Sequence, residues 1–491
     1  MDILATVVKL VQSGLGNLAA YLAAHVLLCL LPAFFIAGGL TTLIPKEAVT
    51  RFLGRTTPKF ISYPAAAMAG SLLAVCSCTI VPLFAGIYKK GAGIGPAITF
   101  LFFAPASNIL ALAYTGVALG SDLALARLLL SLAFGIGIGL IMAMLFSRQD
   151  AAHDKSTDAI FAGQGKMNRW ALVFLLLLVA LLLAGTFKVA LLTEPYFQVS
   201  LPSLGLDRLE EWFFHIIPFD ASKGEEGVTA QGAILVSLLA MIGLTAWKGL
   251  NNILEGFSCW TWISLSLVAL TLLVGALGIN PHADGIELSF TGRFFTIALL
   301  LLAVAFIGAR RLEPRQIQEW LWESWRFVKQ IFPLLIVGVF TVGIIRQIIR
   351  PEWIESLAGS NTILGNLAGV VFGVFMYFPT LVEVPIAKMF LSLGMHRGPL
   401  LAYLMSDPEL SLQSILIIST IIGRLRAWTY VGWVALFSAL AGLIYGAWVD
   451  GNSVWLLAGY VSIFLAVLSV GLFILGKRSR KKEVIEPNIA G

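Results

Sequence analysis

Charged residues are scarce in this chain. Asp, Glu, Lys and Arg make up 12% of its 491 residues, against roughly 25% in an ordinary soluble domain. This low share excludes a soluble globular domain. It also argues against a nucleic-acid partner, because the basic residues behind the formal net charge of +6 sit in short clusters between apolar runs and in the tail at 477–482. Such clusters indicate membrane topology.

Cysteine and histidine are scarce as well. The chain has four cysteines, all in or beside apolar runs, which does not indicate the disulfide framework of a secreted protein. Its five histidines are scattered, and the sequence contains neither H-E-x-x-H nor the phosphate loop G-x-x-x-x-G-K-[ST]. We therefore expect no cofactor and no ATP-driven step. Any transport would draw on an ion gradient or on the gradient of the substrate itself.

Long apolar runs fill most of the sequence. Hydrophobic residues make up 58% of it, the mean hydropathy is +0.90, and apolar windows recur from about residue 25 to residue 476. Each window is long enough to cross a hydrocarbon core of about 30 Å as a helix, whereas barrel strands would alternate in short segments. The sequence predicts an all-α polytopic membrane protein that crosses the lipid bilayer of the cell inner (plasma) membrane many times. Residues 1–24 lack a basic start and a cleavage site, so we expect an interfacial or membrane helix there.

Two parts of the chain repeat each other at an offset of 303 residues. Most of the matching positions are glycine or proline, which mark backbone shape rather than mere hydrophobicity. The matches pair Gly70 with Gly373, Val81 with Val384, Pro82 with Pro385, Gly91 with Gly394, Gly95 with Gly398, Pro96 with Pro399 and Pro105 with Pro408. We predict homologous membrane units at 25–147 and 328–450.

The remaining segments separate or follow the two units. The central segment, 148–327, has apolar runs near 170–191, 232–248, 260–279 and 294–309. It also holds an acidic stretch, 192–231, in which 206–219 fits either an amphipathic surface helix or a solvated loop. Residues 451–491 are predicted to form a last membrane helix and a basic cytoplasmic tail.

The positive clusters bear on the orientation of the units. If every apolar run crosses the membrane, Arg310 and Arg311 lie on the opposite side from the tail. The conflict disappears if 60–90 and 363–390 each enter and return on one side as a broken helical hairpin. The two units are then inverted, with broken or re-entrant helices around a central cavity, and the acidic stretch is external. Parallel repeats with full spans are the alternative.

A Cys-x-Cys pair lies where the first hairpin would break. Cys76, Ser77, Cys78 and Thr79 form this segment, and Tyr377 and Thr380 belong to its counterpart in the second unit. On a continuous helix, side chains two residues apart point in different directions. At a break, both sulfurs can face one ligand, so Cys76 and Cys78 are candidate transient ligands for a soft metal or metalloid. Packing of small residues between membrane helices is the alternative.

Proline and polar residues follow in both units. Pro105 lies inside an apolar run with Asn108 beside it, and Glu383 and Asp407 are carboxylates inside apolar runs. Such carboxylates are expensive in a membrane and are by default candidates for function. They fit either a proton relay or a buried ion pair with Lys388, Arg424 or Arg426. Lys89 and Lys90 fit interfacial anchors, or contacts to an anionic substrate.

These segments resemble a known family. "CSCTIVPLFAGIYKKGAGIGPAITFLFFAPASN" (76–108), with "GPLLAYLMSDPELSLQSILII" (398–418) and "RLRAW" (424–428), is similar to the signatures of the ArsP/YraQ-type predicted permeases. The resemblance implies a permease that exports a small thiophilic solute, such as a trivalent organoarsenical or a soft metal. It implies thiol ligands at Cys76 and Cys78, with the bend at Pro105 and Asn108 beside them. A membrane thiol-redox enzyme, or a permease for a non-metal solute, is the alternative.

Overall fold

Helices dominate the structure, because a helix satisfies its backbone hydrogen bonds internally even in lipid. The structure is a computed structural model. It describes residues 3–24, 26–72, 77–161, 169–186, 190–202, 229–282, 285–348, 351–375, 383–407, 409–453, 455 and 459–462. The prediction of an all-α polytopic protein is confirmed.

The first part of the chain contains nine helices among its described residues. They are α1 (Ile3–Ala24), α2 (Val26–Thr42), α3 (Lys46–Leu53), α4 (Lys59–Leu72), α5 (Ser77–Lys89), α6 (Ile94–Ala106), α7 (Ile109–Leu119), α8 (Ser121–Leu145) and α9 (Ser147–Phe161).

The central part contains long helices and three short strands. Its elements are α10 (Arg169–Thr186), α11 (Ala190–Thr193), β1 (Pro195–Pro202), α13 (Ala230–Gly249), the 3₁₀ turn η2 (Ile253–Glu255), α14 (Cys259–Ala276), β2 (Gly278–His282), β3 (Gly285–Thr291) and α15 (Gly292–Arg311).

The last part is again helical. Its elements are α16 (Pro314–Ile348), α17 (Pro351–Ala358), α18 (Ile363–Phe375), α19 (Glu383–Ser392), α20 (Arg397–Ser406), α21 (Leu412–Ile422) and α22 (Arg424–Val449).

Seven helices in the described part of the chain are long and apolar enough to span a bilayer. They are α8, α10, α13, α14, α15, α16 and α22, and the pair α6 and α7 passes the same test as one span bent by 41°. Four of them, α10, α13, α14 and α15, coincide with the apolar runs predicted for the central segment.

Helix bounds correspond between the first and last parts at the predicted offset of 303. Helices α7 and α21 match residue for residue, and the starts of α6 and α20 and of α8 and α22 match as well. The backbone conformation corresponds too: Gly120 and Gly423 both have positive φ, at 116° and 88°, where α8 and α22 begin. Side chains rarely adopt this conformation, so glycine at both positions marks the same turn.

Two short helices flank the predicted hairpin break in each part. Helix α4 has 14 residues and α5 has 13, which gives each a length of about 20 Å, short of the bilayer's hydrocarbon core. The two ends of this pair lie together, because the Gly93 N–H donates to the Leu53 carbonyl (2.8 Å). In the last part the His396 N–H donates to the Ala358 carbonyl (2.9 Å), which brings the ends of the α18 and α19 pair together.

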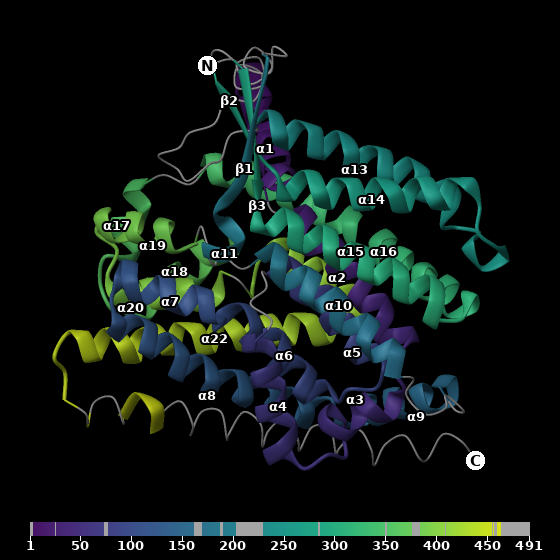
Figure 1. Cartoon of the computed structure of the whole chain (residues 1–491). Coiled ribbons are helices and arrows are strands. Elements are labelled where there is room, and N and C mark those ends of the chain that lie inside the picture. Colours follow the sequence, from purple (N-terminus) through teal and green to yellow (C-terminus); the bar gives the residue numbers. More distant parts are fainter. Residues whose placement is uncertain are drawn as a thin grey trace, which may run out of the picture.

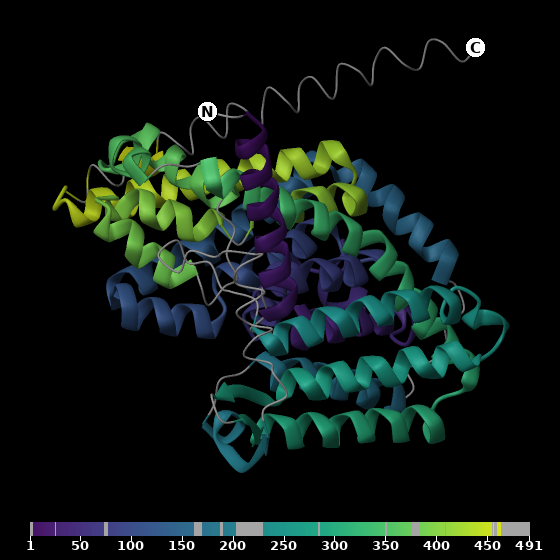
Figure 2. The same cartoon turned by 90° about the horizontal axis from the view of Figure 1, so that it is seen from above.

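The two parts interlock, and the central helices cover one side of them. Helix α5 packs against α21, and α19 packs against α7. In Figure 1, α20, α7, α22 and α8 lie next to one another. Figure 2 shows α13, α14 and α15 side by side as a separate layer, and α2 and α16 pack between this layer and the rest.

The strands form a small sheet that the sequence does not reveal. Its order is β1-β3-β2, and both pairings are antiparallel. It adjoins the end of α14 and the start of α15, so it lies at the opposite end of these helices from Arg310 and Arg311. Strand β1 falls inside the acidic stretch 192–231. The segment 206–219 lies outside the described residues.

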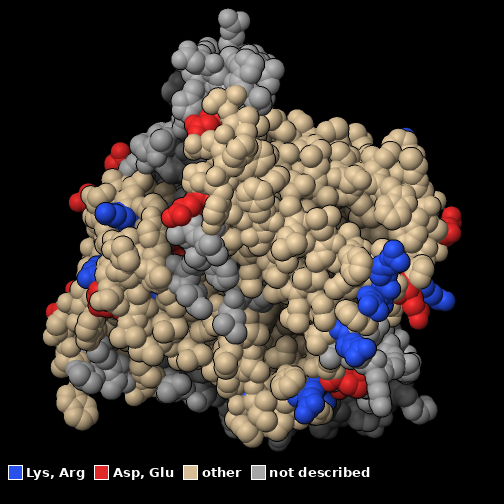
Figure 3. Space-filling view, in the orientation of Figure 1, with Lys and Arg blue, Asp and Glu red and all other residues tan. Residues whose placement is uncertain are grey.

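On the face shown in Figure 3, basic side chains gather mainly at one end. Figure 3 shows Lys and Arg concentrated at the lower right, over the end that carries α3 and α9 in Figure 1. Two of the long helices also end in basic residues. Arg310 and Arg311 are in the last turn of α15, and Lys248 is in the last turn of α13.

Candidate functional site

Helix breaks of the two parts meet at their junction. Helix α6 ends at Ala106 and α7 begins at Ile109, with a bend of 41° between them. At the corresponding place, α20 ends at Ser406 and α21 begins at Leu412. A helix that ends inside the protein leaves carbonyl groups without helical partners, and these need other donors.

Arg127 on α8 supplies such a donor. Its Nε donates to the Ala106 carbonyl (2.8 Å), and its Nη1 donates to Thr115 Oγ1 (3.1 Å). Its Nη2 donates to Glu383 Oε1 at 2.6 Å, and neither side chain is exposed to solvent. The guanidinium therefore joins the C-terminal end of α6, where the helix dipole favours a cation, to the first turn of α19.

Two more carboxyl groups surround this pair. The carboxyl of Asp407 lies near that of Glu383, and the two groups interact. Glu409 accepts a hydrogen bond from the Tyr430 hydroxyl (2.8 Å) and interacts electrostatically with Glu383 and Arg127. We call Arg127, Glu383, Asp407, Glu409 and Tyr430 the buried cluster. All five side chains are at most 3% exposed.

The buried cluster is asymmetric between the two parts. At the offset of 303, Glu383 corresponds to Ile80, and Asp407 and Glu409 correspond to Ala104 and Ala106. Tyr430 corresponds to Arg127. The last part thus supplies all three carboxyls and the first part supplies the cation.

Several polar atoms near the breaks lack hydrogen-bond partners within the described part of the chain. They are Glu383 Oε2, Glu409 Oε1, Ser107 Oγ and both amide atoms of Gln413. Native proteins leave few buried polar atoms unpaired, and each one calls for an explanation. Here they lie beside the two breaks, so the junction offers polar atoms that can hydrogen-bond to water or to a solute, or bind a proton.

The structure describes only some of the predicted site residues. Cys76, Tyr377 and Thr380 lie outside the described residues. Ser77 and Cys78 begin α5, but their side chains also lie outside the description. Thr79, which follows them, is fully buried.

Pro105 and Asn108 flank the break next to Arg127. Pro105 is buried in the last turn of α6. Asn108 is the N-cap of α7, and its Oδ1 accepts from the Ala111 N–H (2.7 Å). Ser411 caps α21 at the corresponding position. Asn108 thus has a structural task, and its contact to substrate stays a prediction.

The ion-pair partners named from the sequence, Lys388, Arg424 or Arg426, are wrong for Glu383. Glu383 pairs with Arg127, whereas Arg426 donates to the Tyr88 hydroxyl (2.8 Å) and Lys388 is exposed. The sequence could have identified Arg127. It is a charged residue in the middle of the apolar run that forms α8, and such a residue is a functional candidate by default.

Lys90 is placed differently from the predicted interfacial anchors, and for Lys89 the prediction stays open. Lys89 Nζ lies 4.0 Å from the centre of the Phe327 ring. Lys90 is fully buried, and its Nζ donates to the Thr41 carbonyl at the end of α2 (2.6 Å). Burial lowers the pKa of Lys90, which lies in the turn after α5, to about 8.

Within the described residues, no three or more His, Cys, Asp or Glu side chains are arranged so that they could hold a metal ion. The proposed ligands Cys76 and Cys78 are not part of that search, so the metal prediction stays untested. The buried cluster itself has the chemistry to hold and exchange protons, because three carboxyls share one fixed cation.

Comparison with known proteins decides the family. A model of the ArsP_1 family, described as "Predicted permease", matches residues 13–447. The chain belongs to the ArsP_1 family of predicted permeases. It is similar to UPF0718 protein MJ0584 of Methanocaldococcus jannaschii, with 33% identity over 446 residues that cover 91% of this chain and 98% of the relative.

A second similarity is more limited. UPF0718 protein YraQ of Escherichia coli is 27% identical over 124 residues, which cover 25% of this chain and 35% of that protein. No solved structure matches the chain. Membership of ArsP_1 and the apolar helices together identify a multi-pass membrane permease, which favours a transporter over a thiol-redox enzyme.

Proposed function

We propose that this ArsP_1 permease exports a small thiophilic solute, such as a trivalent organoarsenical or a soft metal ion, across the cell inner membrane. In this proposal the solute passes between the two repeat units at the helix breaks, and proton movement through the buried cluster drives it. The observation that carries the proposal is the Arg127–Glu383 pair with two further carboxyls at the junction of broken helices.

Charge balance supports proton coupling. Arg127 neutralises one carboxylate, so three ionised carboxyls would leave a buried net charge of −2. Uncompensated charge of that size is very costly in a low-dielectric interior. We infer that the buried cluster holds a proton on Asp407 or Glu409 in this conformation, and that transport moves this proton.

The repeat relates the thiols to the buried cluster. Glu383 is in the first turn of α19, and the position in α5 that corresponds to it is Ile80. Cys78 precedes Ile80 by two residues. In the proposed inverted arrangement, the start of each hairpin's returning helix lies near the midplane, where transporters with broken helices bind their substrates.

The basic end supports the proposed orientation. Lys and Arg collect in cytoplasmic connections, and the clustered side chains in Figure 3 fit a cytoplasmic end that carries α3, α9 and the connection between α15 and α16. The small sheet is then external. Both hairpins are re-entrant in this proposal, one from each side of the membrane.

Transport by cysteine variants in proteoliposomes tests the proposal. Serine resembles cysteine in size but lacks the soft sulfur, so Cys76→Ser or Cys78→Ser should insert normally and lose transport of a trivalent methylarsenical. Cys29→Ser and Cys259→Ser serve as controls. Full transport of the methylarsenical by the Cys76→Ser, Cys78→Ser double variant would exclude the thiol mechanism. No transport of it by the parent protein would instead favour a permease for a non-metal solute.

A further inference from the structure

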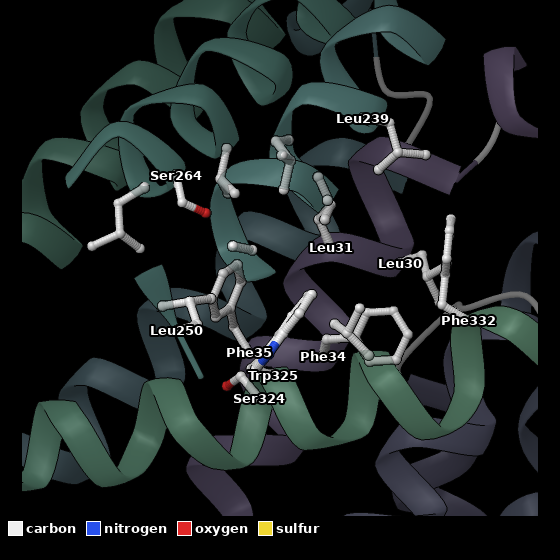
Figure 4. Close-up of a pocket in the computed structure, with 16 residues that line it drawn as sticks. Leu30, Leu31, Phe34, Phe35, Leu239, Leu250, Ser264, Ser324, Trp325 and Phe332 are labelled. Atoms are coloured by element: carbon white, nitrogen blue, oxygen red, sulfur yellow. The ribbon is translucent and has the colours of Figure 1, made fainter. Parts of the chain in front are cut away.

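An apolar pocket lies between the central layer and the rest of the protein, away from the buried cluster. Its volume is about 130 Å³, and it is lined by residues of α2, α13, α14 and α16 (Figure 4). Phe34, Phe35 and Leu31 of α2 face Trp325 and Phe332 of α16 across it. An apolar cavity of similar size is known to take up a small hydrocarbon rather than water.

The lining of the pocket extends along α13. It runs there from Leu239 to Leu250, which corresponds to about 16 Å along the helix. At Gly243, which lines the pocket, an added Cβ would meet no heavy atom within 4 Å, and this residue is exposed. The pocket is therefore accessible from the lipid side.

Lysines and tryptophans surround one end of this pocket. Lys329 Nζ donates to Asn251 Oδ1 (2.8 Å), the same atom that accepts from Trp325 Nε1 (2.8 Å). Trp325 is itself part of the pocket lining. Lys329 Nζ also lies 4.9 Å from the centre of the Trp322 ring, and Lys248 Nζ lies 4.7 Å from the centre of the Trp260 ring.

Each of these features has a counterpart in a phospholipid. Tryptophan and lysine collect at the level of lipid headgroups, and basic pockets between membrane helices bind anionic headgroups. The apolar channel extends inward from this basic end, as an acyl chain extends from its headgroup. Lys248 is in the last turn of α13, and the ammonium group of Lys329 reaches Asn251 just beyond that turn.

We propose that this pocket is a specific site for an anionic phospholipid. Part of one acyl chain lies in the pocket between α2, α13, α14 and α16, and the phosphate contacts Lys329 and Lys248. The lipid would then bridge the central layer to α2 and α16. Charge decides between a phospholipid and an apolar solute, because a solute without an anionic group would gain nothing from the two lysines.

Binding of phosphatidylglycerol and of zwitterionic phosphatidylcholine to the purified full-length protein, measured by native mass spectrometry, tests the proposal. The parent protein should prefer phosphatidylglycerol. Lys248→Gln and Lys329→Gln should each weaken phosphatidylglycerol binding about fivefold, as expected for the loss of one positive charge near a lipid surface. Gly243→Leu should reduce the binding of both lipids, because its side chain obstructs the channel.

Two matched variants control for general effects. Arg315→Gln removes a charge from the same helix, α16, at a position far from the pocket, and should leave binding unchanged. Gly432→Leu adds the same side chain to an exposed face of α22, where an added Cβ also meets no atom within 4 Å.

Three outcomes would overturn the proposal. They are equal binding of the two lipids to the parent protein, unchanged phosphatidylglycerol binding in the lysine variants, or equal effects of Gly243→Leu and Gly432→Leu. The lysine variants keep the proposal testable if Gly243→Leu does not fold. The binding measurement is independent of transport, so its result does not depend on the proposed substrate.

Discussion

Arg127 and Glu383 form an ion pair 2.6 Å long in which neither side chain is exposed, although 256 residues separate them in the chain. The pair ties α8 of the first part to α19 of the last part. Removing one partner of a buried pair leaves an uncompensated charge, whereas replacing both with apolar residues is often tolerated.

The first prediction concerns stability. Arg127→Met should destabilise the protein by about 3–5 kcal/mol, because Glu383 then lacks its counter-ion. The Arg127→Met, Glu383→Leu double variant should recover part of this loss, so that unfolding in denaturant gives a coupling energy of about 2 kcal/mol or more. Recovery stays partial because Asp407 and Glu409 also depend on the arginine.

An exposed pair provides the control for this cycle. Arg315 and Glu319 lie on the surface of α16, with their side chains 86% and 45% exposed. The same double-mutant cycle there should give a coupling of about 0.5 kcal/mol or less. Equal coupling at the two places would mean that the Arg127–Glu383 pair contributes nothing special to the fold.

The second prediction concerns proton coupling. Asp407→Asn and Glu409→Gln keep the size of each side chain but cannot bind and release a proton, so both variants should lose the response of transport to an imposed pH gradient. Counterflow of substrate, which needs no net proton movement, should persist. The measurement is uptake into proteoliposomes with and without the gradient. Glu319→Gln, at the surface, is the control, and a wild-type gradient response in both cluster variants would assign the carboxyls a purely structural role.

The third prediction concerns the orientation of the repeats. Lys59 and Thr362 occupy corresponding exposed positions at the start of α4 and just before α18. In a Cys259→Ser background, which removes an exposed cysteine, an impermeant thiol reagent should label Lys59→Cys from the cytoplasm and Thr362→Cys from outside. Labelling of both from one side would establish parallel repeats. Arg148→Cys and Asn452→Cys provide reference positions near the two ends of the molecule.

Hydropathy and glycine positions account for what the sequence revealed of the fold. A membrane helix needs a long apolar run, so α10, α13, α14 and α15 were visible as such. The glycines Gly91 and Gly394 have φ of 93° and 90°, and a turn that requires this conformation keeps its glycine where other residues change. The positions of glycine and proline were therefore enough to identify the 303-residue offset between the two units.

Long-range contacts account for what the sequence did not reveal. Strand β1 pairs with β3, which lies more than 80 residues later in the chain, and neither strand is long enough to stand out from its neighbours. The carboxylate Glu383 could be picked out because charge is costly in an apolar run, but its counter-ion lies in another unit. Lys90 looked like a surface anchor because nothing local shows that the end of α2 covers it.

The last prediction concerns Lys90. Burial lowers the pKa of its ammonium group to about 8, although Glu47 and Glu323 face it and favour the charged form. In the unfolded chain, lysine has a pKa of about 10.4. Between these values the unfolded state binds more protons than the folded state, so stability should rise as the pH increases from about 8 to about 10.4. The neutral amine can still donate to the Thr41 carbonyl.

Thermal unfolding of the parent and of Lys90→Met across this pH range isolates the contribution of Lys90, because other titrating groups affect both proteins alike. The unfolding midpoint of the parent should rise relative to that of Lys90→Met, by an amount that corresponds to about 3 kcal/mol at most. Lys90→Arg should be destabilised throughout, since arginine keeps its charge at these pH values. A constant difference between the parent and Lys90→Met from pH 8 to pH 10 would mean that Lys90 keeps an ordinary pKa despite its burial.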